Sequence, residues 1–252
     1  MILIEKAEVM GFEQAIRGMR NPMNSWDRSD SGICKGGNSG IGCDNCAADR
    51  FCEHTYDHSF QIGKNDYELM MELANGGPVH AKFRRMIAVY VDITAPLYWW
   101  KEFDTYKVGT VANSCSTMHK IHEKKFMLED FSHEHLLAED DLIPDNSLYF
   151  CYTKESLKKT IIMLNSARDN FKATGDKLWW WQMIQLLPSS YNQKRTVMLN
   201  YEVLAGIYEH RRNHKLDEWK EFCEWIEELP WREIITKKKI KVEFEGVETN
   251  VD

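Results

Sequence analysis

The stretch from residue 88 to residue 103 constrains the fold most, because it predicts a strand that leads directly into a helix. Residues 88–93, Ala-Val-Tyr-Val-Asp-Ile, are β-branched or aromatic at most positions, which favours a strand. Pro96 follows, and proline is tolerated in the first turn of a helix. The expected helix begins with an aromatic cluster, Tyr98, Trp99, Trp100 and Phe103. A chain with this junction must combine strands and helices.

Small residues follow the aromatic helix, namely Thr105, Gly109, Thr110, Asn113, Ser114, Ser116 and Thr117, with Lys107 among them. A solvent-exposed helix would hold Lys, Glu and Gln at such positions. Short hydroxyl and amide side chains beside one cation suit a pocket in which the backbone approaches a polar ligand closely. The alternative interpretation is a buried amphipathic helix followed by a Ser/Thr-rich turn.

Length and charge limit the class of protein. The 252 residues suffice for one large domain spanning 1–252, and the hydrophobic and charged contents of 43% and 28% are ordinary for a globular protein. The net charge of −7 argues against general nucleic-acid binding. No apolar run is long enough for a membrane span, and the first residues are too short and too charged for a signal peptide. We therefore expect a cytoplasmic protein without a membrane partner.

Residues 31–59 form a Cys/Gly-rich segment that we expect to be an insertion loop. Cys43 and Cys46 have the Cys-x-x-Cys spacing that brings two sulfurs to one tetrahedral metal ion. Cys34 and Cys52 would complete a structural zinc site, with Cys52 and His54 as another pairing. No second Cys-x-x-Cys follows, so an iron–sulfur cluster and unligated or redox-active cysteines stay open as alternatives.

Periodic patterns predict the remaining elements. Apolar residues at spacings of three and four predict helices over 67–75, 136–142, 154–173, 177–187, 196–213 and 215–229, after short helices at 11–20 and 81–86. Residues 237–252 alternate apolar and charged side chains and predict a strand, which could pair with a strand at the N-terminus. The expected fold is therefore α/β of the α+β kind, with a small antiparallel-rich sheet and a large helical part.

Three stretches in order resemble a known family. Thr105-Tyr106-Lys107 is followed after eight residues by Ser116, and Asn113 stands three residues before that serine. His80 and the strand at 88–93 precede this stretch, while Leu187-Pro188, Asn200 and Arg211 follow it. This order resembles flavin-dependent thymidylate synthases, whose signature reads Arg-His-Arg, seven or eight residues, then Ser. The resemblance covers roughly residues 60–225.

The resemblance implies the family's fold, a homotetramer, and methylene transfer from methylenetetrahydrofolate to deoxyuridylate (dUMP) with FAD as hydride carrier. Nucleotide and folate would then be the small-molecule partners. It also implies residue roles. Arg211 would be the catalytic residue, binding the nucleotide phosphate or polarising its base, and Ser114 and Ser116 would bind the nucleotide. The residues implied to contact FAD are His80, Lys107, Asn113 and Asn200.

The signature is degenerate at several positions. Thr105 and Tyr106 replace an Arg and a His, Ser114 replaces a Glu, and Glu202 stands where the family has an Arg. We expected Glu202 to repel a phosphate and Arg211 to continue an inward stripe of Leu204, Ile207 and Tyr208. Two alternatives of other classes follow: a non-catalytic nucleotide-binding or assembly protein on the same scaffold, and a zinc-dependent interaction protein.

Overall fold

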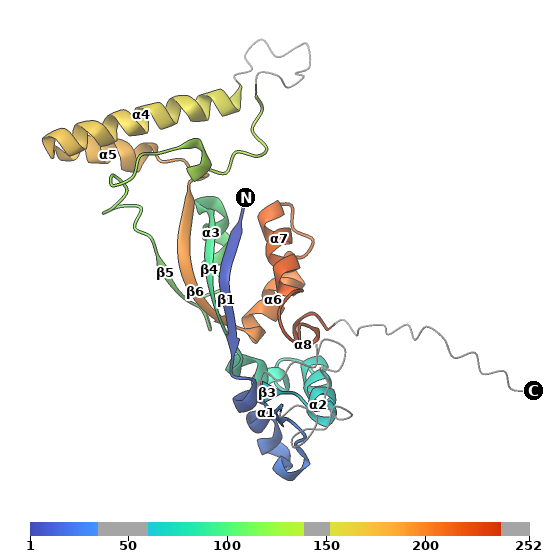
Figure 1. Cartoon of the computed structure of the whole chain (residues 1–252). Helices are drawn as coiled ribbons and strands as arrows, with labels where there is room; N and C mark the ends of the chain where they lie inside the picture. The colour runs from blue at the N-terminus through green and yellow to red at the C-terminus, as the bar shows by residue number, and fades with distance from the viewer. Residues whose placement is uncertain (35–59, 139–151, 238–252) are drawn as a thin grey trace, which may run out of the picture. The chain divides into compact units, whose positions relative to one another are not determined.

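The computed structural model describes residues 1–34, 60–138 and 152–237 (Figure 1). Their contacts form two compact units. Unit 1 comprises Met1–Glu8, Val89–Leu199 and Asn213–Phe222, and unit 2 comprises Val9–Ala88, Asn200–Arg212 and Cys223–Asp252. The fold class is as expected, a mixed α/β structure with a small antiparallel-rich sheet and many helices. In the described stretches, no helix combines the length and apolar character needed to cross a membrane.

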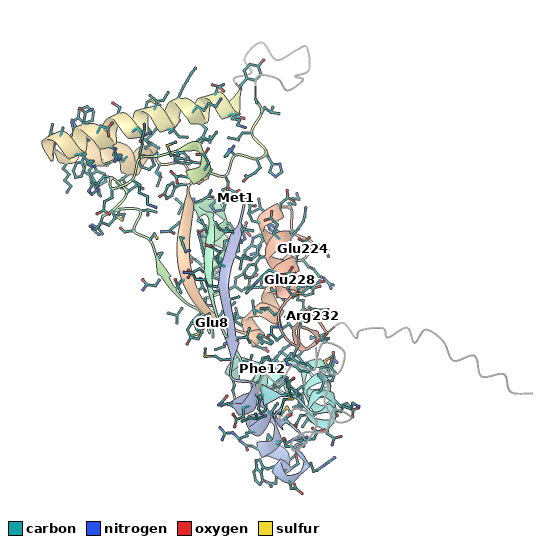
Figure 2. All side chains as sticks on the ribbon, in the orientation of Figure 1. Met1, Glu8, Phe12, Glu224, Glu228 and Arg232 are labelled. Carbon is teal, nitrogen blue, oxygen red and sulfur yellow. The ribbon has the colours of Figure 1, made fainter. Side chains whose placement is uncertain are left out.

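The main sheet has four strands in the order β1-β4-β6-β5. They are β1 (Leu3–Met10), β4 (Ala88–Pro96), β6 (Asn192–Asn200) and β5 (Val111–Ser114). Figure 2 shows β1 running from near Met1 past Glu8. Strand β5 pairs antiparallel with β6, so that Asn113 lies opposite Thr196 and Ser114 opposite Arg195. The strand β4 and the helix α3 (Leu97–Phe103) confirm the junction predicted around Pro96.

An aromatic cluster fills the core of unit 1. Its members are Trp99, Phe103, Trp219 and Phe222, which are fully buried. Their ring centres lie 4.7–6.5 Å from one another. Trp219 and Phe222 come from α7 (Asp217–Ile226), whose apolar face was predicted from its spacing. Each large ring removes about 150–250 Å² from water, so this cluster is a main source of stability in unit 1.

Two packed helices, α4 (Thr153–Thr174) and α5 (Lys177–Leu186), form a second helical part of unit 1 (Figure 1). Gly175 ends α4 in the left-handed region, with φ 69°, and Asp176 caps α5 by accepting a hydrogen bond from the Leu178 amide at 2.9 Å. Leu164 and Met183 are fully buried between them. Of the three adjacent tryptophans, Trp179 and Trp180 pack on this core, whereas Trp181 is 44% exposed.

Unit 2 is mainly helical. It contains α1 (Phe12–Arg20), α2 (Lys64–Asn75), α6 (Tyr201–Arg211) and α8 (Glu233–Thr236) with the 3-10 helices η1 (Asn21–Met23), η2 (Trp26–Arg28) and η4 (Ala81–Met86). A two-stranded antiparallel sheet, β2 (Gly32–Ile33) with β3 (Phe60–Gln61), also belongs to it. Among the described residues, the remaining helix is η5 (Leu128–Asp130), in unit 1.

A buried carboxylate holds the beginning of α2. Asp66 is fully buried and forms an ion pair with Arg20 at 2.5 Å. Its other oxygen accepts hydrogen bonds from the hydroxyls of Ser29 and Ser31 at 2.7 and 2.6 Å. The helix was expected over 67–75 with Asn65 and Asp66 as its cap, but it begins three residues earlier, at Lys64 after Gly63. Asp30 accepts the amide hydrogen bonds of its first turn.

Two helical predictions are wrong in part: the helix predicted over 196–213 is present only as α6, and the helical pattern expected from residue 119 onwards fails up to residue 138. Residues 192–200 form β6 rather than the start of a helix over 196–213, because Val197 and Leu199 are buried while Thr196 and Met198 are less so, a period of two. Residues 119–138 contain only the short η5, since long-range contacts such as the mutual hydrogen bonds of Asn165 with the Phe126 backbone fix this segment. The rest of the helix expected over 136–142 and the strand expected over 237–252 lie almost wholly outside the described residues.

Candidate functional site

The predicted site residues fall into two groups. Lys107, Asn113, Ser114 and Ser116 belong to one continuous segment of unit 1, and all four are exposed. His80, Asn200 and Arg211 belong to unit 2. Each group is described on its own below.

The segment of unit 1 is organised by β5. Successive side chains of a strand point to opposite faces, so Asn113 and Ser114 face different sides of the sheet although they adjoin in the sequence. The pairing with β6 gives each one a different environment. A single ligand that met both would have to reach around the edge of the sheet.

Ser114 shares its face with Arg195, the residue directly opposite on β6. The Arg195 guanidinium lies 4.1 Å from the centre of the Trp100 ring and donates a hydrogen bond of 2.7 Å to Asp104. Its Nε donates to the side chain of Gln193 at 3.0 Å. A cation held in this way is fixed in orientation beside Ser114. The sequence analysis missed Arg195, since only the strand pairing places it there.

Asn113 shares its face with a network of charged and polar groups. Thr196, opposite Asn113, donates to Asp92 at 2.6 Å, and Lys194 lies 3.3 Å from the same carboxylate. The hydrogen bond from Thr196 is the main cause that lowers the pKa of Asp92, and Lys194 adds to it. Lys194 also pairs with Glu5 at 3.1 Å. This face therefore holds a carboxylate that stays ionised beside an amide.

Ser116 lies in the turn after β5. Its hydroxyl oxygen accepts hydrogen bonds from the amides of Met118 and His119 at 3.3 and 2.8 Å. The hydroxyl hydrogen stays available to donate, because both of those bonds use the oxygen as acceptor. The backbone beside it is fixed, as the Cys115 amide donates to the Lys194 carbonyl at 2.9 Å.

Lys107 follows the end of α3, and the two residues before it have structural contacts. Thr105 donates its hydroxyl hydrogen to the carbonyl of Glu102 at 2.7 Å, at the end of the helix. The ring of Tyr106 lies 6.1 Å from that of Trp219. These positions, where the resembling family has an Arg and a His, therefore support α3 and the aromatic cluster in this chain.

In unit 2, Asn200 is the N-cap of α6. Its side-chain oxygen accepts from the amides of Glu202 and Val203, both at 3.1 Å. Its NH₂ group still has two donors. His80 is exposed at the start of η4. Arg211 ends α6 and is half-buried, whereas Leu204, Ile207 and Tyr208 are buried as the stripe predicted.

Glu202 is neutralised within unit 2. The buried Arg84 guanidinium contacts Glu202 through Nε and Nη2, each at 2.7 Å, and donates through Nη1 to the Ile234 carbonyl at 3.0 Å. The expected repulsion of a phosphate by Glu202 is therefore offset by a paired cation. Arg84 was not singled out in the sequence, and the pairing of a residue in η4 with one in α6 has no sequence signal.

One of the four predicted zinc ligands, Cys34, belongs to the described residues. Cys43, Cys46 and Cys52 lie outside the described residues, while Cys34 is a free, half-buried thiol. In the stretches that are described, no group of three or more His, Cys, Asp or Glu side chains is arranged to hold a metal ion.

Comparisons with known proteins identify the fold. No family model and no curated protein matches the chain. The structure of flavin-dependent thymidylate synthase ThyX from Helicobacter pylori complexed with FAD and dUMP is similar with a TM-score of 0.58 and 14% identity, covering 94% of this chain and 98% of that one. The UMP/dUMP methylase PolB from Streptomyces cacaoi bound with 5-Br dUMP is similar with a TM-score of 0.54 and 12% identity, covering 94% and 95%. The chain thus shares the fold of these nucleotide-modifying enzymes.

Proposed function

We propose that this chain is a flavin- and nucleotide-binding protein that acts as flavin-dependent thymidylate synthases do. It would transfer a methylene group from methylenetetrahydrofolate to dUMP, or to an altered substrate, with FAD as hydride carrier. The main support is the exposed cation, amide and hydroxyls of residues 107–116, carried on a fold shared with proteins solved with FAD and dUMP.

The side chains of this segment fit an anionic ligand. Those of Lys107, Asn113 and Ser114 make no hydrogen bond or ion pair within the described stretches, so their donors are available. Ser114 and Ser116 would donate to the nucleotide phosphate, and Lys107 would add a point charge on phosphate or flavin. Asn113 would contact FAD. When bound, reduced FAD supplies the hydride, while the protein supplies binding, orientation and charge.

The resemblance also assigns roles to three residues of unit 2. His80 is exposed, and the free NH₂ group of Asn200 would donate to FAD while its oxygen caps α6. Arg211 would bind the nucleotide phosphate or polarise its base, since its guanidinium is always charged. The assembly would be a homotetramer.

A second candidate is a nucleotide-binding or assembly protein without the chemistry. It is favoured by Thr105 and Tyr106, which have structural contacts where the family has cationic side chains. Loss of each charge-assisted contact costs roughly 1.5–3 kcal/mol of binding. Such a protein would bind dUMP without FAD. The zinc-dependent interaction protein stays a prediction.

The visible spectrum and dUMP binding of the purified protein test these candidates. The proposal predicts flavin absorbance after purification or after added FAD, and calorimetric binding of dUMP. Lys107→Ala should weaken dUMP binding about 10- to 100-fold, because it removes a charged donor. Lys101→Ala, at an exposed lysine of α3, is the matched control and should bind normally. Protein that takes up neither FAD nor dUMP would contradict both candidates.

A further inference from the structure

The helix α4 has two faces of different character. Leu157, Ile161, Leu164 and Ala167 are buried on one face and pack on the core shared with α5. On the opposite face, Ile162 is 68% exposed, while Met163, at the border of the buried face, is 51% exposed. Figure 2 shows side chains standing on the side of α4 that faces away from α5. One exposed aliphatic side chain is ordinary on a helix, so the neighbours of Ile162 decide what this face can bind.

The exposed face carries a regular pattern around Ile162. Lys159, Ile162, Ser166 and Asp169 are all exposed and follow one another at spacings of three, four and three. That spacing keeps residues on one stripe of a helix and is the spacing by which two helices pack along their length. The stripe places a cation at one end, an anion at the other, and a large and a small residue between them.

The stripe is complementary in charge and size to a second copy of itself that runs antiparallel. Residue 164 is the midpoint both of the pair Lys159 and Asp169 and of the pair Ile162 and Ser166. Two copies of α4 packed antiparallel about that midpoint would set each Lys159 opposite the other copy's Asp169. Each Ile162 would then meet a Ser166, a large side chain against a small one. A two-fold contact requires this reciprocity, because residue i meets j wherever j meets i.

We propose that the outer stripe of α4, residues 159–169, is an interface with the α4 of a second copy of this chain, packed antiparallel about a two-fold axis. Self-complementary charge is what selects a second copy over another protein, which would need no such symmetry. Asp169 is 67% exposed and also contacts Arg168 at 2.6 Å, so it can accept a second cation. The interface uses none of the residues assigned to FAD or nucleotide. It rests on the self-association included in the proposed function, whose flavin and nucleotide binding are tested separately.

Charge exchange tests the pairing. The parent protein should be an assembly by size-exclusion chromatography with light scattering. Lys159→Glu places two like-charge pairs in the interface and should halve the mass at micromolar concentration, weakening association roughly tenfold or more. The double variant K159E/D169K restores opposite charges and should restore the mass. Lys172→Glu makes the same charge change on α4 away from the stripe and should leave the mass unchanged.

The outcomes of these experiments show whether α4 of a second copy, or another surface, contacts the outer stripe of α4. A monomeric parent, or an assembly whose mass Lys159→Glu does not change, would overturn the proposal. A mass that falls with Lys159→Glu but is not restored in K159E/D169K would show a contact with a different surface and would overturn the two-fold pairing. Far-UV circular dichroism of every variant checks that α4 is still helical. Flavin absorbance, measured in parallel, reports on the proposed function alone.

Discussion

Single residues of unit 2 carry charge in the interior, and Asp66 is the clearest case. Burial disfavours its ionised form, but hydrogen bonds from Ser31 and Ser29 and the Arg20 guanidinium outweigh that effect, so the pKa of Asp66 is lowered. A buried pair of this kind adds little net stability over an apolar pair, yet it is costly to break. The whole network therefore depends on one carboxylate.

Asp66→Asn should destabilise the protein by about 3–5 kcal/mol, because it leaves the Arg20 guanidinium buried without a counter-charge. Urea unfolding followed by circular dichroism measures the change. Glu123→Gln is the control, since it breaks an exposed pair with Lys120 and should cost under about 1 kcal/mol. Equal losses in the two variants would contradict this account of Asp66.

The lowered pKa also fixes the sign of the acid dependence of Asp66. The unfolded chain takes up a proton near the ordinary Asp value of 3.8, whereas the folded protein resists until a lower pH. The stabilisation from Asp66 is therefore complete above that value and is lost as pH falls through the folded pKa. Asp66→Asn should show less of this acid loss than the parent.

For single residues, the sequence indicates which polar side chains gather in a segment, but it does not indicate which side chains pair across the fold. The exposed hydroxyls of Ser114 and Ser116 and the cation Lys107 could be predicted, because small polar residues cluster there. Arg195 and Arg84 could not, since their partners are 91 and 118 residues away along the chain and strand or helix packing brings them together.

Among the elements, the junction of β6 and α6 shows where the sequence misled. The helical spacing of Leu204, Ile207 and Tyr208 was extended backwards over Thr196 and Val197, whose β-branched side chains belong to a strand. Asn200 marks the true boundary, because Asn is a favoured N-cap. By contrast α4, α5 and α7 were predicted correctly, since their apolar residues keep a helical period throughout.

Asn200 should therefore show two separable effects. Asn200→Ala removes the cap of α6 and should cost about 1 kcal/mol, whereas Asn200→Asp keeps an acceptor oxygen and should retain most of the stability. If the NH₂ group of Asn200 also donates to FAD, both variants lose flavin affinity. Thermal unfolding and flavin titration of the two variants measure these effects. Full flavin affinity in Asn200→Asp would remove Asn200 from the flavin site while leaving its capping role.

For the whole molecule, Cys223 offers a probe of global unfolding. It adjoins the boundary between the two units along α7, and burial, with Glu227 nearby, raises the pKa of its thiol to about 12. The thiolate is the reactive form, so the native thiol should be nearly inert at pH 8. The ordinary value is 9.0, so the stability that Cys223 contributes should be lost as pH rises from about 9 towards about 12.

Alkylation with iodoacetamide, followed by peptide mass spectrometry, measures the reactivity of the Cys223 thiol. Exposed Cys115 should be labelled at once in the native protein, while labelling of Cys223 should follow the urea unfolding curve. If Cys223 were labelled as fast as Cys115 without denaturant, α7 would open independently of the fold.

The pairing of β2 with β3 limits how far the length of the connection between them can affect the fold of unit 2. Gly32 lies opposite Gln61, so the two ends of the connection between these strands are held at neighbouring positions about 5 Å apart. On the β2 side, Asp30 donates its amide hydrogen to Asp66 and accepts from the Asn65 amide, which ties this end of the connection to α2. The cost of closing a connection grows only slowly with its length. We therefore expect the pairing of β2 and β3 to tolerate changes in the length of the connection between them.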